Sequence, residues 1–169
     1  AVGQVATVGQ IHTEQGVAWA VDELRRMDMY HRQMTAGRVG ELGFSADVVL
    51  PMKPSEYFER NVWIGASFPS PGEAEAITEL GTHKVMWGSD YPHHEGTYPY
   101  TVESLQRAFH HWDPADLRKV LSENAAELYG FDLDTLAPLA AEHGPSAERV
   151  AKPLESVPEG ATSPAFFKK

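Results

Sequence analysis

The 169-residue chain contains no cysteine. Disulfides and thiolate zinc sites are therefore excluded, and any bound metal must be held by histidine and carboxylate side chains. Basic residues are also scarce, with 14 Lys and Arg against 24 Asp and Glu, which gives a formal net charge of -10. Such a charge opposes binding to nucleic acid and to anionic membrane surfaces. The lack of cysteine fits a cytoplasmic protein.

Long apolar runs and nucleotide-binding glycine patterns are missing from the sequence as well. No stretch approaches the roughly 20 apolar residues that span a bilayer, so we expect no membrane partner. The glycines never fall in G-x-G-x-x-G or G-x-x-x-x-G-K order, which disfavours nucleotide binding. An apolar fraction of 42% nevertheless predicts a globular domain with a sizeable core.

Apolar periodicity predicts strands that alternate with helices. The three predicted strands cover residues 4–13, 62–66 and 84–88. The predicted helices run from Val17 to about Met34, over residues 73–80, from about Thr101, and from Asp113-Pro114 to Gly130. This order predicts an α/β fold with parallel strands joined by right-handed crossovers.

Two segments lack a sustained period. Residues 35–54, which are rich in glycine and proline, predict a loop with at most a short insert, and a loop of that length is often functional, for example as a lid. The chain after residue 131 turns rich in proline and alanine, with a weak helical pattern near residues 134–142. We therefore expect residues 132–169 to form an extension, with a mobile or draped tail from residue 145.

Asp90 is the residue most clearly placed for chemistry. It follows a short apolar run, Val85-Met86-Trp87, and the flexible pair Gly88-Ser89. In α/β enzymes the residue just beyond the carboxyl end of a parallel strand faces the ligand crevice, where a carboxylate can bind metal or accept a proton. The alternative is that Asp90 only caps the turn before Pro92. Local sequence leaves both interpretations open.

Two short motifs give the chain a family resemblance. One is Gly-Ser-Asp-Tyr-Pro-His at residues 88–93, and the other is Asn-Ala-Ala-Glu-Leu-Tyr-Gly at residues 124–130. Either is weak alone, but together they are fairly specific. Over about residues 4–131 the chain resembles the amidohydrolase-related, decarboxylase-like branch of the amidohydrolase superfamily. The supporting residues are Trp19, Leu24, Asp28 and residues 54–58 and 62–63.

The resemblance implies a partial barrel. Members of the family form a TIM (β/α)8 barrel, and this chain resembles its carboxyl-terminal part, with strands corresponding to the sixth, seventh and eighth. A complete barrel takes roughly 250 residues, which is more than the chain offers. Family members bind one divalent metal, usually zinc, through an early His-x-His pair, histidines on middle strands and an Asp on strand eight. Asp90 aligns with that Asp.

The chain departs from the family pattern in its histidines. It has no His-x-His pair, and the resemblance places Glu14 where many relatives carry a metal-binding or substrate-facing His. His12 is a second candidate ligand, because it would share a face with Glu14 if the strand persists. His93 lies in the recognised loop and is a candidate catalytic residue beside Asp90. Simple exposure at a strand end or on a loop is the alternative for His12, Glu14 and His93.

These features imply a metal-dependent hydrolase or decarboxylase acting on a small organic acid, amide or lactone. Asp90 would bind the metal, with His12 and Glu14 as further ligands, or act as a base, whereas the departure in histidines leaves open a metal-free relative. The principal alternative is a chain that is inactive alone. An incomplete barrel exposes sheet edges, which favours a homo-oligomer or a second chain that supplies the missing half.

Overall fold

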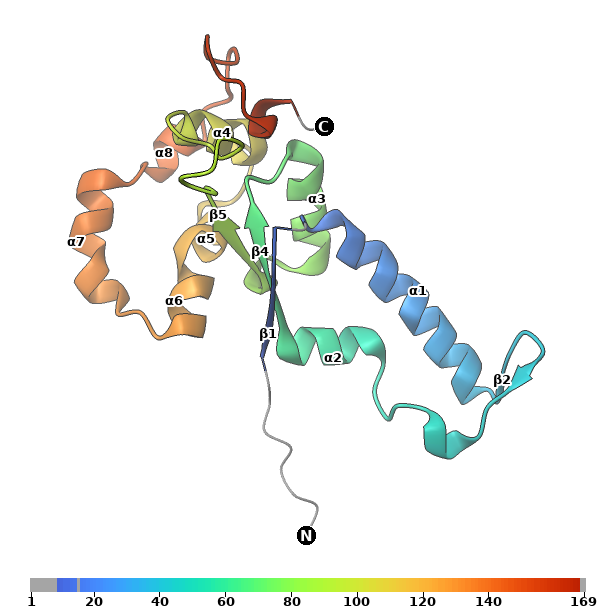
Figure 1. Ribbon diagram of the computed structural model, residues 1–169. Coiled ribbons are helices and arrows are strands. Elements are labelled where there is room, and N and C mark those ends of the chain that lie inside the picture. The colour runs from blue at the N-terminus through green and yellow to red at the C-terminus, as the bar shows by residue number, and fades with distance from the viewer. Residues whose placement is uncertain (1–8, 15, 168–169) are drawn as a thin grey trace.

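Figure 1 shows a computed structural model of the chain, which describes residues 9–14 and 16–167. Its centre is a parallel three-stranded sheet in the order β1 (Gln10–Thr13), β4 (Val62–Ser67) and β5 (Val85–Gly88). The register places Thr13 opposite Gly65 and Ser67 opposite Gly88. The predicted alternation of parallel strands and helices is therefore confirmed. Residues 4–8 of the first predicted strand lie outside the described residues.

The connection from β1 to β4 forms an arm that projects away from the sheet (Figure 1). It consists of α1 (Ala18–Thr35), a hairpin of β2 (Arg38–Val39) and β3 (Leu42–Gly43), the 3-10 turn η1 (Ala46–Val48) and α2 (Pro54–Asn61). Asp28 joins α1 to α2 by accepting hydrogen bonds from the Ser55 amide at 3.0 Å and hydroxyl at 2.7 Å. At 1.5 Å per residue, the 18 residues of α1 carry the hairpin about 27 Å from the helix start. A lid over the site would have to lie at the carboxyl ends of the strands. β1 ends beside the start of α1, whereas residues 35–54 begin at the far end of that helix. The expectation that residues 35–54 form a lid is therefore wrong.

The connection from β4 to β5 is short and strongly specified by sequence. Helix α3 (Pro71–Leu80) and the 3-10 turn η2 (Thr82–Lys84) form it. The buried Ser70 hydroxyl accepts from the Glu73 amide at 3.2 Å, while the Glu73 carboxylate accepts from the Ser70 amide at 3.0 Å. This reciprocal cap satisfies two amide donors that the first helical turn leaves free. Gly81, with a φ of 110°, ends the helix.

The elements that follow β5 are all helical among the described residues. Helix α4 (Thr101–Phe109) precedes a nearly continuous helix formed by α5 (Pro114–Arg118), the π-helical turn η3 (Lys119–Glu123) and α6 (Asn124–Tyr129). Asp113 caps α5 by accepting from the Ala115 amide at 2.8 Å, and Gly130 ends α6 with a left-handed φ of 72°. Both boundaries were predicted from the sequence.

The hydrophobic core lies between one face of the sheet and these helices. Ile64 and Val85 project into it from β4 and β5, and α1, α3 and α4 contribute Ala20, Ile77 and Phe109. Because side chains alternate along a strand, Gly65 and Met86 lie on the opposite face. That second face is the one available for a ligand.

After residue 131 the chain first forms an exposed helix and then packs on the rest of the fold. Helix α7 (Leu133–His143) confirms the weak helical pattern, and α8 (Ala147–Val150) follows it. Val150 is buried in the main core, and the 3-10 turn η4 (Pro164–Phe166) lies against α4, so the tail is draped rather than free (Figure 1). A domain boundary at residue 131 stays a prediction, as does closure of the strands into a barrel. No helix within the described part of the chain is both long and apolar enough to cross a membrane.

Candidate functional site

Three residues with unusual backbone conformations mark one edge of the sheet. Across residues 9–14 and 16–167, the non-glycine residues with positive φ are Glu14 (64°), Phe68 (38°) and Asp90 (61°). Glu14 follows the end of β1, Phe68 follows the end of β4, and Asp90 lies two residues beyond β5. A left-handed conformation costs a non-glycine residue about 1–3 kcal/mol, and such residues cluster at functional sites. The carboxyl edge of the sheet is therefore the edge that these strained residues mark as a candidate functional site.

A pocket of about 370 Å³ lies at this edge. Glu14 and Asp90 both line it, together with apolar surface from Ile11, Met86 and Tyr129. Ligand pockets commonly combine mostly apolar walls with a few converging polar groups. Two carboxylates from different strands thus converge on a cavity of a size that suits a small organic molecule.

Asp90 is held tightly by its own loop. Its side chain is only 13% exposed, and its Oδ1 lies 3.1 Å from Nδ1 of His93. The His93 amide donates to the Asp90 carbonyl at 2.8 Å, and the Gly96 amide donates to the His93 carbonyl at 3.0 Å. The Glu95 carboxylate completes a group with Asp90 and His93 in which the donor atoms all lie within 4.8 Å of one another.

The second half of the loop packs back on the first. The buried Thr97 donates its amide to the Ser89 carbonyl at 2.9 Å, and its hydroxyl lies 2.9 Å from that of Thr101. A Cβ on Gly96 would lie 2.8 Å from the Ser89 oxygen and 2.9 Å from the Asp90 oxygen, closer than side chains tolerate. The loop therefore needs glycine at this position, and its compactness fixes the main chain around Asp90.

His12 lies apart from the other predicted site residues. Its ring packs edge-on against Trp19 of α1, with 6.0 Å between ring centroids, and it does not line the pocket that contains Glu14 and Asp90. The predicted shared face of His12 and Glu14 required the strand to continue. The strand instead ends at Thr13, and Glu14 has a positive φ, so the alternation of side chains stops before it.

The segment that contains the Asp90 loop matches a known protein family. A family model described as Amidohydrolase matches residues 50–131. This segment belongs to the amidohydrolase superfamily. No curated protein matches the chain. The amidohydrolase segment contains β4, β5 and the whole Asp90 loop, whereas β1, with His12 and Glu14, lies before it.

Glu95 is the one member of this group that sequence reasoning missed. The signal was present as the spacing Asp90-x-x-His93-x-Glu95 directly after a strand of the amidohydrolase segment. Within a compact loop, residues three and five positions beyond Asp90 can turn back toward it. The two turns that begin at Asp90 and His93 do this, and they bring Glu95 to the carboxylate.

The donor chemistry of this group fits a divalent metal. Amidohydrolases typically bind divalent metals, and two carboxylates with one imidazole offer the oxygen and nitrogen donors that zinc accepts in a chain without thiolates. His93 and Glu95 are exposed and Asp90 is partly buried, so an ion would be reached from solvent. Asp90 is also the member that links this group to the pocket lined by Glu14.

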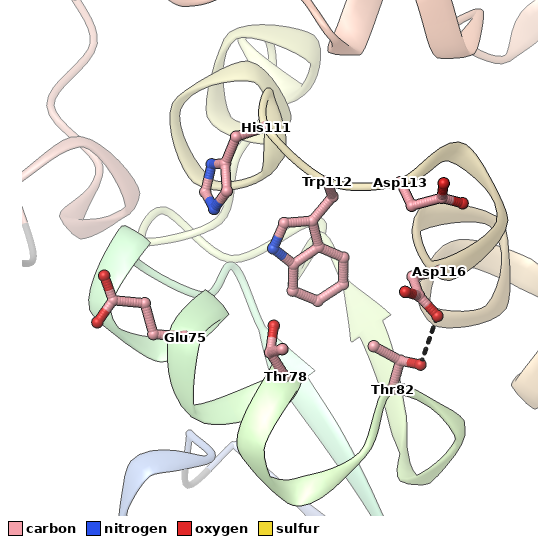
Figure 2. Close-up of a pocket in the computed structure, with 7 residues that line it drawn as sticks. All are labelled: Glu75, Thr78, Thr82, His111, Trp112, Asp113 and Asp116. Atoms are coloured by element: carbon pink, nitrogen blue, oxygen red, sulfur yellow. Dashed lines mark hydrogen bonds between the residues drawn. The ribbon is translucent and has the colours of Figure 1, made fainter.

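A second hollow, of about 400 Å³, lies among the helices rather than at the strand ends (Figure 2). Trp112 stands at its centre, and α3 and α5 form opposite walls (Figure 2). Its two aspartates have structural partners: Asp116 accepts from the Thr82 hydroxyl at 2.9 Å, and Asp113 caps α5. We therefore assign the candidate site of the amidohydrolase segment to the carboxyl edge of the sheet.

Proposed function

We propose that this chain is the carboxyl-terminal part of a (β/α)8 barrel and contributes to a metal-dependent hydrolase or decarboxylase. In this assignment β1, β4 and β5 are the sixth, seventh and eighth strands. The observation that carries the proposal is the convergence of Glu14 and Asp90 at one pocket, at the carboxyl edge of a parallel sheet that includes amidohydrolase sequence. Active sites of TIM-barrel enzymes lie at that face of the barrel.

Asp90, His93 and Glu95 would hold the metal, for which zinc is the best fit. When bound, the ion supplies positive charge that polarises a carbonyl group and makes a water molecule a better nucleophile. Asp90 has the more demanding role, as a ligand or as the acceptor of a proton at its carboxylate. His93, 3.1 Å from that carboxylate, orients it and can share the proton.

The pocket favours a small substrate with an apolar body. Ile11, Met86 and Tyr129 provide contacts for a ring or short hydrocarbon. Glu14 and Asp90 repel an anionic group, so an organic acid depends on the metal to offset the two carboxylates, whereas a neutral amide or lactone does not. The proposed substrates are therefore small amides, lactones or organic acids, the acids only with metal present.

Substitution of Asp90 tests the assignment. Metal content by mass spectrometry and turnover of a panel of lactones, amides and aromatic acids would be measured for the wild type and Asp90→Asn. Asp113→Asn is the matched control, because Asn caps a helix as well as Asp does. We expect stoichiometric metal in the wild type and the control and its loss in Asp90→Asn. Full metal content and turnover in Asp90→Asn would contradict the proposal.

The open edges of the sheet favour a second candidate, a half-barrel that acts only with a partner. All four residues of β1 are exposed, and no strand within the described residues pairs with the outer edges of β1 or β5. Such edges pair readily with another chain. The partner would be a second copy or a chain that supplies the missing half. Light scattering separates the candidates, since a monomer with turnover would exclude the need for a partner.

A further inference from the structure

The C-terminal segment, residues 154–166, lies outside the amidohydrolase segment yet contacts the Asp90 loop. Ser163 is 8% exposed, and its hydroxyl donates to the main-chain carbonyl of Glu95 at 2.5 Å. The same oxygen accepts from the Ala165 amide at 3.1 Å. A buried hydroxyl with both functions satisfied holds its neighbours firmly, because breaking either bond leaves a polar group without water. Ser163 thus fixes the backbone at one member of the proposed metal-binding group.

Two further hydrogen bonds attach the C-terminal segment beside the loop. The Tyr100 hydroxyl, directly before α4, donates to the Glu159 carbonyl at 3.0 Å. The Arg107 guanidinium, on α4, donates to the Ala165 carbonyl at 3.3 Å. Burial lowers the pKa of Arg107 from its ordinary value. These bonds hold the segment on both sides of Ser163, so its hydroxyl is presented to Glu95 by a fixed backbone.

A small apolar cluster links the C-terminal segment to the other side of Asp90. Phe68 is buried with Ala165 and Phe166, and Tyr100 packs against them. The Phe68 amide donates to the Gly88 carbonyl at 2.9 Å, two residues before Asp90. Phe68 has a positive φ, and burial of its ring by the C-terminal segment helps to offset that strain. The segment therefore supports the main chain before Asp90 through Phe68 and after it through Ser163.

We infer that the C-terminal segment positions the Asp90 loop and that Ser163 is a positioning residue for the group formed by Asp90, His93 and Glu95. The inference rests on the proposed function only in naming what the loop is positioned for. Deleting the Ser163 hydroxyl should free the Glu95 carbonyl and loosen residues 89–100, while the main core on the far side of α4 stays intact. The expected signature is local opening without global unfolding.

Hydrogen exchange measured by mass spectrometry tests this on the full chain without any ligand. Ser163→Ala should speed exchange of the peptide covering residues 89–100 about tenfold, as expected for one lost buried hydrogen bond. Exchange in α3 should be unchanged. Ser163→Thr keeps the hydroxyl and should restore slow exchange. Ser146→Ala is the matched control, because its hydroxyl caps α8 and does not contact the loop.

Equal exchange of residues 89–100 in Ser163→Ala and the wild type would overturn the inference. Equally rapid exchange in α3 would also overturn it, because Ser163 would then support the whole fold rather than the loop. Zinc titration separates this result from the proposed function. Weaker zinc binding by Ser163→Ala than by Ser146→Ala is expected if both proposals hold. If the wild type binds no zinc, the proposed function fails, while the exchange result still decides the role of Ser163.

Discussion

Replacing Asn124 by Asp tests how β5, and with it Asp90, is held in place. Asn124 lies where the π-helical turn meets α6, and its side chain is buried at 6% exposure. Its Nδ2 donates to the Thr82 carbonyl and to the Val85 carbonyl, both at 2.7 Å. These bonds tie the helix to the start of β5. Aspartate has the same shape but no donor when it is ionised.

The magnitude follows from the two bonds. Each buried hydrogen bond contributes about 1 kcal/mol net, and leaving buried acceptors unsatisfied costs a further 1–3 kcal/mol or so. The carboxylate would face two carbonyl oxygens, so we expect Asn124→Asp to lower the free energy of unfolding by roughly 4 kcal/mol at pH 7. That is a large part of the 5–15 kcal/mol or so typical of a domain.

The pH dependence has a definite sign. Burial and the two carbonyls disfavour the charged form, so the pKa of the introduced carboxyl should rise in the folded state. Its protonated form can donate one hydrogen bond, so the deficit of Asn124→Asp should shrink as the pH falls.

Urea unfolding followed by circular dichroism, at neutral and mildly acidic pH, measures both effects. Asn61→Asp is the matched control, since Asn61 only accepts from Arg60 through Oδ1, a role that Asp retains. A stability for Asn124→Asp within 1 kcal/mol or so of Asn61→Asp, or a deficit independent of pH, would refute the reasoning.

Two further predictions concern a loop glycine and a helix cap. Gly96→Ala should lower the free energy of unfolding by about 1–3 kcal/mol, because three main-chain oxygens lie 2.8 to 3.0 Å from the new Cβ. Gly88→Ala is the control, because a Cβ at that position would meet no atom within 4 Å, and it should change the free energy of unfolding little. Equal urea midpoints for Gly96→Ala and Gly88→Ala would contradict the close packing at Gly96. Thr135→Val should raise the pKa of Asp132 toward its ordinary 3.8, because the Thr135 hydroxyl is the main cause of its lowering, and a carboxyl titration by nuclear magnetic resonance measures this. Because the pKa of Asp132 is lowered in the folded state, its carboxylate stabilises α7 fully above pH 3.8. That stabilisation is lost as the pH falls through the lowered pKa. Signals of α7 that already change above pH 3.8 would contradict the assignment.

The elements that sequence predicts best are those with local signals at both ends. Pro71 and Gly81 bound α3, and Asp113 and Gly130 bound the long helix that includes α5 and α6. Caps and glycine stops act through neighbouring backbone groups, so they need no knowledge of the rest of the fold. The position of Asp90 could be predicted for the same reason, because the apolar strand that places it comes just before it in the sequence.

Features set by distant contacts could not be predicted in this way. The positive φ of Glu14, which separates its side chain from His12, depends on how the end of β1 meets β4. The bond from Ser163 to Glu95 joins residues 68 positions apart, in a segment without periodicity. Neither feature leaves a pattern in the local sequence, because its cause is tertiary packing.

Two of the left-handed residues at the strand ends make the same main-chain hydrogen bond to the neighbouring strand, and this pattern has a consequence for the unpaired edge of β5. The Glu14 amide, after β1, donates to Gly65 of β4 at 3.3 Å, and the Phe68 amide, after β4, donates to Gly88 of β5 at 2.9 Å. Each bond extends the parallel ladder toward the next strand, which is why the backbone tolerates the strained φ. Asp90, the third left-handed residue, lies two residues beyond β5, and its carbonyl accepts from its own loop at His93. A ladder bond of the same kind from the Asp90 amide requires a strand on the outer edge of β5, which is what the remainder of the proposed barrel supplies. Completing the proposed barrel would therefore add a main-chain contact at Asp90 from the outer edge of β5, an edge that pairs with no strand among the described residues.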